Sequence, residues 1–126
     1  GPQIAEHMST EVRSLSQEAT LREAGQLMQK WKLGSLLLTD NQSYVGFITD
    51  SALAREVVAN GMNPNTTPAK TCMRKPVVAI EGDRPIIDAV RMMKDQATRH
   101  LAVTQDGQII GVISVSNILR YYSGVV

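Results

Sequence analysis

The chain has 126 residues, of which 43% are hydrophobic and 20% are charged, and its formal net charge is +1. This length suits one compact domain or two very small halves that share a core, and the apolar content argues against a disordered chain. The balanced charge gives no basic face for nucleic acid, and no apolar run approaches the ~20 residues of a membrane span, so we expect neither a nucleic-acid nor a membrane partner.

The first half of the chain predicts a short strand, a helix and then a pair of strands. Val12–Leu15 reads as the short strand, and apolar residues at helical spacing predict a helix over Leu21–Trp31. The segments "SLLLT" and "YVGFIT" then read as two strands joined by the turn "DNQS".

A second helix is expected to close the first half. Ser51 is placed to cap its start, and Gly61 is a candidate for its C-terminal cap. The residues that this helix should carry inward are Leu53, Val57 and Val58. The Pro- and Asn-rich stretch "NPNTTPAK" follows, and we interpret residues 63–71 as a linker.

The second half predicts the same elements in the same order. Val77–Ile80 reads as a strand, Asp83 as the N-cap of a helix over residues 86–93, and Pro85 as part of its first turn. The segments "HLAVT" and "IIGVIS" read as strands, and the Asp-Gly pair of "QDGQ" suits a tight hairpin between them. Ser116 is placed to cap the last helix.

The two halves are a tandem repeat. Shifted by 65 positions, residues 8–57 align with residues 73–122 without a gap, and ten of the fifty positions are identical. These are Met8/Met73, Val12/Val77, Ala24/Ala89, Met28/Met93, Leu36/Leu101, Thr39/Thr104, Gly46/Gly111, Ile48/Ile113, Ser51/Ser116 and Arg55/Arg120. Two copies are too few for a solenoid, so we expect the apolar faces of repeat 1 (8–62) and repeat 2 (72–126) to close on one another.

Each half resembles a CBS domain, and the whole chain resembles the tandem CBS pair called a Bateman module. The phrases "MSTEVRSL", "CMRKPVVAI", "RHLAVTQDGQIIGVIS", "GFITDSAL" and "GVISVSNI" carry the resemblance. It implies a mixed α/β (α+β) fold of two β-α-β-β-α repeats, related by a pseudo-two-fold axis and packed through their sheets. It also implies a regulatory, non-catalytic homodimer that binds AMP, ADP, ATP or S-adenosylmethionine between the repeats and is read by an effector protein or a fused domain.

Each half also has a corner where a strand ending in a hydroxyl residue meets a helix. Free backbone N–H groups at such a corner favour an anion such as phosphate. The second copy offers Ser114 and, one helical turn on, Asn117, whose amide can reach a ribose hydroxyl. The first copy offers Thr49 and Ala52, and Ala52 can make no such bond. We therefore expect the second corner to bind a nucleoside more tightly, because a lost bond to a buried hydroxyl costs ~1–3 kcal/mol.

The family pattern has Asp where this chain has Asn117, and it combines the corner of one repeat with segments of the other. The resemblance then implies that the Ser114 and Asn117 cleft is completed by residues of repeat 1, namely Val12, Arg13, Leu15, Leu33, Gly34 and Ser35. It implies that the Thr49 cleft is completed by Val77, Val78, Arg99 and His100, the last two resembling a basic pair that contacts phosphate in some members.

Other interpretations of these residues stay open. Ser114 and Thr49 can act as helix caps alone, and Arg99 and His100 can be a surface pair. A second function is a structural module for dimerisation or docking, which Ala52 and Asn117 favour, since neither corner keeps the Asp of the family pattern. The sequence has no nucleophile–base pair, carboxylate dyad, metal-ligand spacing or Gly-rich phosphate loop, so we expect no enzymatic activity, no metal and no required cofactor. The single cysteine, Cys72, cannot form an internal disulfide, which favours an intracellular, cytoplasmic protein.

Overall fold

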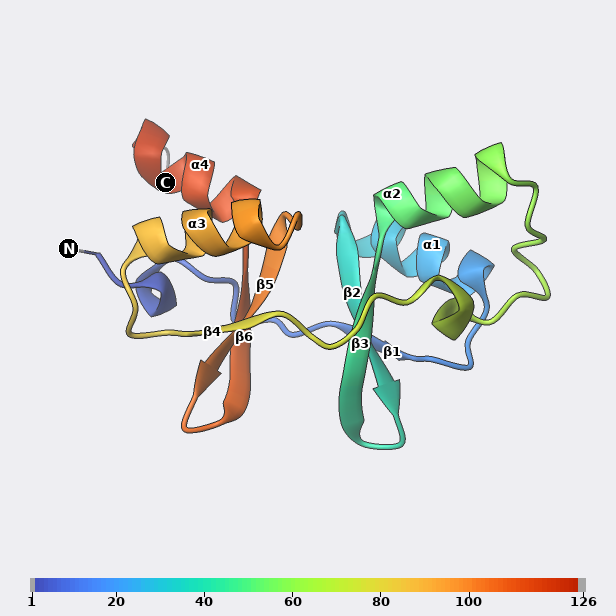
Figure 1. Ribbon diagram of the computed structural model, residues 1–126, viewed down its shortest axis with the longest axis horizontal. Coiled ribbons are helices and arrows are strands. Elements are labelled where there is room, and N and C mark those ends of the chain that lie inside the picture. Colours follow the sequence, from blue (N-terminus) through green and yellow to red (C-terminus); the bar gives the residue numbers. More distant parts are fainter. Residues whose placement is uncertain (1, 125–126) are drawn as a thin grey trace. The chain divides into compact units, whose positions relative to one another are not determined.

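A computed structural model describes residues 2–124 and shows a mixed α/β fold with two three-stranded sheets (Figure 1). The first sheet contains β1 (Ser14–Ser16), β2 (Ser35–Asp40) and β3 (Ser43–Thr49). The second sheet contains β4 (Ala79–Glu81), β5 (His100–Gln105) and β6 (Gln108–Ser114). In both sheets the first strand pairs parallel to the second, and the second pairs antiparallel to the third. The predicted order of strands and helices is therefore confirmed.

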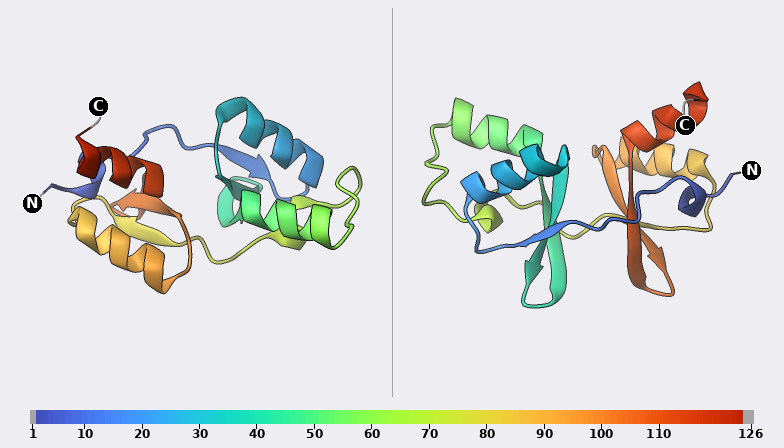
Figure 2. Two further views of the ribbon diagram at one scale, coloured as in Figure 1. Left: turned by 90° about the horizontal axis from the view of Figure 1, so that it is seen from above. Right: turned by 180° about the vertical axis from the view of Figure 1, so that it is seen from behind.

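The helices of each half lie along one side of its own sheet (Figures 1 and 2). They are α1 (Leu21–Trp31) with α2 (Asp50–Leu53) in the first half, and α3 (Ile86–Asp95) with α4 (Val115–Ser123) in the second. A π-helical segment (Ala54–Ala59) continues α2, and short 3-10 helices span Ile4–Glu6 and Ala69–Cys72. The apolar spacing of α1 and α3 predicts which of their side chains are buried. Leu21, Ala24 and Met28 of α1 lie in one core, and Ile86, Ala89 and Met93 of α3 lie in the other.

The helix starts differ from the sequence prediction. Ser51 and Ser116 are not the N-caps, because the capping residues are the last residues of the preceding strands, Thr49 and Ser114. Each has extended backbone and accepts from the backbone N–H three residues on. The predictions for Asp83 and Pro85 are also wrong, because Pro85 is itself the N-cap, with extended backbone, and α3 begins at Ile86.

Two strand boundaries and one inward-facing residue are also corrected. The short strands begin two residues later than predicted, at Ser14 and Ala79, where their pairing with β2 and β5 begins. Val58 is 83% exposed rather than buried, because the helix widens to π geometry over Ala54–Ala59 and Asn60 N–H donates to the Arg55 carbonyl oxygen. This i→i+5 geometry breaks the 3.6-residue period on which the prediction rested. Gly61 lies just after the π-helical segment and has a φ of 72°, as expected for a glycine at a helix end.

The chain divides into two compact units that do not follow the order of the repeats. The α1–α2 unit contains Arg13–Val77, and the α3–α4 unit joins the chain up to Val12 to the part from Val78 onward. The segment that precedes repeat 1 therefore packs on repeat 2. The segment interpreted as a linker packs on repeat 1, where Ala69 is fully buried.

The two packed segments are counterparts. Ile4 is fully buried in the α3–α4 unit, and Ala69 is its equivalent 65 positions later. Ser9 exchanges two backbone hydrogen bonds of 2.9 Å with Val112 of β6, and Arg74 exchanges backbone hydrogen bonds of 2.8 and 2.9 Å with Phe47 of β3. The structural repeat thus begins upstream of residue 8, where the sequence comparison began.

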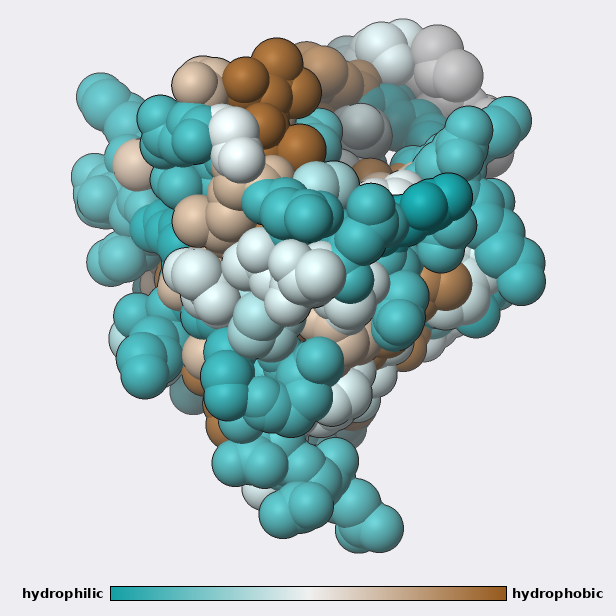
Figure 3. Space-filling view, turned by 90° about the vertical axis from the view of Figure 1, so that its right-hand side faces the viewer, coloured by the Kyte–Doolittle hydropathy of each residue, from teal (hydrophilic) through white to brown (hydrophobic). Residues whose placement is uncertain are grey.

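Hydrophilic residues cover most of the face shown in Figure 3, and the hydrophobic residues on it gather near the top of that view. Exposed large hydrophobic side chains among residues 2–124 include Ile87 on α3 and both Leu119 and Tyr122 on α4, the last two 62% and 59% exposed. The face shown in Figure 3 is therefore mainly polar, and α3 and α4 contain exposed apolar side chains.

Candidate functional site

The second strand–helix corner is held by a reciprocal set of hydrogen bonds. Ser114 ends β6, and its Oγ accepts from the backbone N–H of Asn117 at 3.2 Å. The Oδ1 of Asn117 accepts from the backbone N–H of Ser114 at 2.8 Å and from its hydroxyl at 3.0 Å. This is a capping box in which Asn replaces the usual Glu or Gln. Oδ1 is committed to the cap, so the Nδ2 amide is the part of Asn117 that can donate to a ligand.

The first corner is capped but offers no comparable group. Thr49 Oγ1 accepts from the backbone N–H of Ala52 at 3.1 Å. Ala52 is only 5% exposed and belongs to the core of its unit. The first turn of α2 also contains a carboxylate, Asp50, whereas the first turn of α4 contains no acidic residue. An anion is therefore better tolerated at the start of α4 than at the start of α2.

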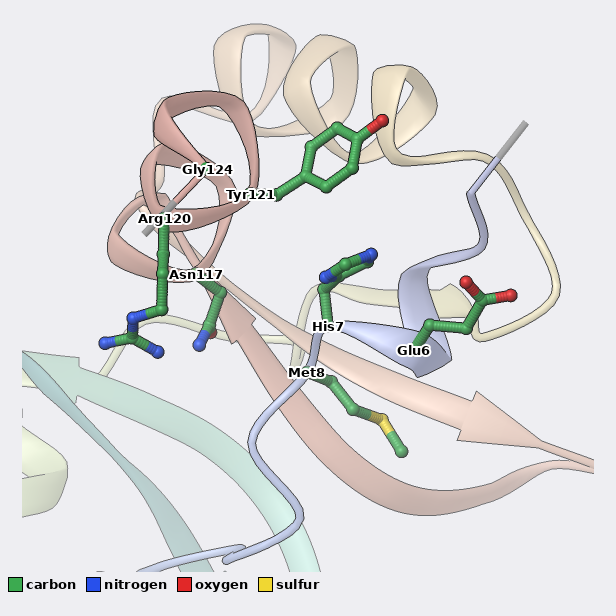
Figure 4. Close-up of a pocket in the computed structure, with 7 residues that line it drawn as sticks. All are labelled: Glu6, His7, Met8, Asn117, Arg120, Tyr121 and Gly124. Atoms are coloured by element: carbon green, nitrogen blue, oxygen red, sulfur yellow. The ribbon is translucent and has the colours of Figure 1, made fainter. Parts of the chain in front are cut away.

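A pocket of about 350 Å³ lies beside Asn117 within the α3–α4 unit (Figure 4). It is formed by α4 and by the segment that precedes repeat 1, and its lining residues are Glu6, His7, Met8, Asn117, Arg120, Tyr121 and Gly124. The rings of His7 and Tyr121 pack against each other with centroids 4.7 Å apart. In Figure 4, Asn117 and Arg120 point to the same side of α4, and Glu6 points away from them. The volume is at the lower end of the range for small-molecule sites.

Arg99 and His100 lie next to this corner in the same unit. His100 is the register partner of Ser114 across β5 and β6, and the carbonyl oxygen of Arg99 accepts from Val115 N–H at 3.0 Å. The buried Thr98 shapes this turn, because its hydroxyl donates to the His100 carbonyl oxygen at 3.1 Å. Their contribution to the Thr49 cleft stays a prediction.

Val78 is in the same unit, where its carbonyl oxygen accepts from Ala102 N–H at 2.9 Å. Val12 is half-buried and is the last residue of the N-terminal segment that belongs to the α3–α4 unit. Their roles as ligand contacts stay predictions.

The remaining predicted site residues belong to the α1–α2 unit. Ser35 is the register partner of Thr49, and Gly34 accepts from Asp50 N–H at 2.9 Å through its carbonyl oxygen. The guanidinium of Arg13 lies 4.4 Å from the ring centroid of Trp31, a cation–π contact that orients this side chain. Their contribution to the Asn117 site stays a prediction.

Asn117 is the one lining residue of the pocket that the sequence predicts as a site residue; the prediction misses Glu6, His7, Met8, Arg120, Tyr121 and Gly124. His7 precedes the aligned repeat, so the comparison of the halves gave no signal for it. Arg120 did carry a signal, because it is identical in both repeats and lies three residues after Asn117, hence on the same helix face.

Neither a metal-ligand cluster nor a membrane-spanning helix is found among residues 2–124. No group of three His, Cys, Asp or Glu residues within residues 2–124 could hold a metal ion. No helix in that range has the length and apolar character needed to cross a membrane.

Comparisons with known proteins agree with this architecture. The model of the CBS domain family matches the chain twice, over residues 4–59 and 69–124. The chain is 29% identical over 119 residues to an uncharacterized protein of Methanopyrus kandleri, MK0525. The aligned region covers 93% of this chain but only 61% of that protein. The first family match begins at residue 4, before residue 8, and the second begins at residue 69, before residue 72. Both matches therefore include the buried residues Ile4 and Ala69.

Solved structures share the fold. A putative signal-transduction protein with CBS domains from Burkholderia ambifaria superposes with a TM-score of 0.93 at 22% identity, covering 98% of this chain and 95% of that one. The CBS domain pair of protein MJ0100, solved in complex with 5-methylthioadenosine and S-adenosyl-L-methionine, superposes with a TM-score of 0.85 at 18% identity, covering 98% and 97%. The doubled sheet and these superpositions show the fold, and the doubled family match establishes that the chain belongs to the CBS domain family, as a tandem CBS pair, a regulatory module.

Proposed function

We propose that this CBS pair is a ligand-sensing module that binds an adenosine-containing nucleotide at the corner of Ser114 and Asn117. The observation that carries the proposal is the pocket beside Asn117, whose Nδ2 amide remains available after Oδ1 has joined the capping box. The first corner has buried Ala52 at the equivalent position, so the proposal assigns the ligand to the second corner.

The class of ligand follows from the chemistry of this corner. An amide donor suits a ribose hydroxyl, and a helix start without an acidic residue suits a phosphate. The MJ0100 pair, which has the same fold, was solved with two adenosine-containing ligands. We therefore expect AMP, ADP, ATP or S-adenosylmethionine, with no cofactor required.

The signal would be a population shift. A ligand changes an equilibrium between two arrangements only by its differential affinity for them. Ligand at the corner of α4 would favour one arrangement of the protein, and an effector protein or fused domain would read it. The module itself catalyses nothing in this scheme.

A thermal-shift panel of adenosine, AMP, ADP, ATP and S-adenosylmethionine tests the proposal. A ligand at 100 times its Kd stabilises the folded state by ~2.7 kcal/mol, which raises the unfolding temperature by several degrees. Asn117→Ala should reduce the shift strongly, and the matched change Ala52→Gly in the other repeat should leave it unchanged. A panel without any shift at millimolar ligand would overturn the proposal, and equal effects of the two variants would place the ligand elsewhere.

A second candidate function, a structural module for dimerisation or docking, is favoured by the exposed apolar side chains of α4. Leu119 and Tyr122 are spaced at i and i+3 on one helix face, 62% and 59% exposed. A flat ligand panel together with a dimer in sedimentation-velocity experiments would favour this function. Leu119→Glu should then yield monomers.

A further inference from the structure

Arg120 places a positively charged side chain in the lining of the pocket, and no carboxylate forms an ion pair with it among residues 2–124. Its side chain is exposed. It lies one turn after Asn117, and both side chains point to the same side of α4 in Figure 4. An amide donor beside a guanidinium favours an anionic acceptor, because bonds to charged groups are about twice as strong as neutral ones.

The equivalent arginine of the first repeat is in a different setting. Arg55 aligns with Arg120, but its neighbour is Glu56, whose carboxylate oxygen lies 3.8 Å from Arg55 Nε. At the position of Glu56 the second repeat has Tyr121, which packs on His7 instead. The position three residues before Arg55 is buried Ala52 rather than an amide. Only the second repeat therefore combines an arginine, an amide donor and a pocket.

The negatively charged and the positively charged side chain that line the pocket, Glu6 and Arg120, lie apart from each other (Figure 4). Glu6 is the single carboxylate among its lining residues, and it points away from Arg120 in Figure 4. The His7–Tyr121 ring pair lies against the same pocket and is anchored by Tyr121, which packs on the core of the unit. A ligand with an anionic group would thus place that group at the end lined by Arg120 and Asn117.

We propose that Arg120 and Asn117 form a phosphate subsite, through which this module distinguishes adenine nucleotides from the uncharged nucleoside. This inference rests on the proposed function, since it specifies which chemical group of the ligand the Asn117 corner selects. It assigns the charge-dependent part of the affinity to Arg120 rather than to Arg99 and His100.

Isothermal titration of adenosine and AMP into the wild-type protein and Arg120→Gln tests the subsite. A hydrogen-bonded charge pair accounts for roughly tenfold or more in affinity, so Arg120→Gln should weaken AMP by about that factor. Adenosine should change by less than about twofold, because it has no phosphate. Arg55→Gln, the same change at the matched position, should leave both affinities unchanged. The wild-type affinity for AMP, but not for adenosine, should also fall as NaCl is raised.

The possible results separate the two proposals. If AMP binds the wild type but Arg120→Gln weakens AMP and adenosine equally, or weakens neither, the subsite is wrong and the proposed function stands. If neither compound binds the wild type, the subsite fails, and the proposed function fails with it only if ADP, ATP and S-adenosylmethionine also give no thermal shift. Circular dichroism and the unfolding temperature of Arg120→Gln establish that the variant is folded.

Discussion

Gly46 and Gly111 are identical in the two repeats because another chain segment lies directly against each of them. A Cβ atom on Gly111 would be 2.5 Å from Sδ of Met8 and 2.6 Å from the backbone oxygen of Ser9. A Cβ atom on Gly46 would be equally close to Met73 and to the backbone of Arg74. Backbone atoms cannot move aside cheaply, so these positions require glycine in order to seat the incoming segment.

Gly111→Ala should therefore destabilise the protein by about 1–3 kcal/mol, the usual cost of overpacking. Gly25→Ala is the matched control, because the nearest atom to its Cβ would be Leu53 Cδ1 at an ordinary 3.9 Å. Replacing a glycine inside α1 should stabilise the protein by about 0.5–1 kcal/mol. Urea denaturation measures both, and a Gly111→Ala variant as stable as the wild type would contradict the close approach.

Cys72 provides a second test at the residue scale. Burial raises the pKa of its thiol, the carboxylate of Glu56 raises this pKa further, and the guanidinium of Arg55 lowers it. The thiolate is the reactive form, so a lower pKa means more thiolate at a given pH. At pH 8, Glu56→Gln should speed alkylation by iodoacetamide and Arg55→Gln should slow it. Rate changes of the same sign in both variants would show that charge does not control this thiol.

At the scale of elements, α4 depends on its capping box more than α2 depends on its single cap. Ser114→Ala removes the bond to Asn117 N–H and the hydroxyl bond to Asn117 Oδ1, whereas Thr49→Ala removes only the bond to Ala52 N–H. Loss of a cap costs about 1 kcal/mol. We expect the greater loss of unfolding free energy for Ser114→Ala, and a greater loss for Thr49→Ala would contradict this comparison.

The elements themselves could be predicted because their apolar spacing is dictated by burial. The strands "SLLLT" and "HLAVT" and the helix over Leu21–Trp31 follow directly from the pattern. The caps could not, because Thr49 and Ser51 are both good capping residues and only the end of strand pairing decides between them. Asn117 was identified from its one-turn spacing, whereas the pocket beside it needs His7, which only the fold brings close.

At the scale of the whole molecule, each repeat is completed by a segment that precedes the other repeat. Comparison of the two halves with each other could not detect this, because Ile4 and Ala69 occupy equivalent buried places with different side chains. Burial selects apolar character there and leaves the size of the side chain to local packing.

Ile4→Ala should therefore weaken the α3–α4 unit, although Ile4 lies in front of repeat 1 in the sequence. Truncating a fully buried isoleucine costs about 2–5 kcal/mol. Amide hydrogen exchange should accelerate chiefly in β5 and β6. Leu21→Ala, the matched truncation in the α1–α2 unit, should accelerate exchange chiefly in β2 and β3. Faster exchange in β2 and β3 on Ile4→Ala would contradict the assignment of this segment.

Titration of the ¹⁵N-labelled protein with AMP, followed by amide chemical shifts, determines whether the corner of Ser114 and Asn117 binds a nucleotide. The account predicts saturable shifts at Ser114–Arg120 and at His7, with much smaller changes at Thr49–Leu53. No saturable shift at millimolar AMP, or larger shifts at Thr49–Leu53 than at Ser114–Arg120, would contradict it.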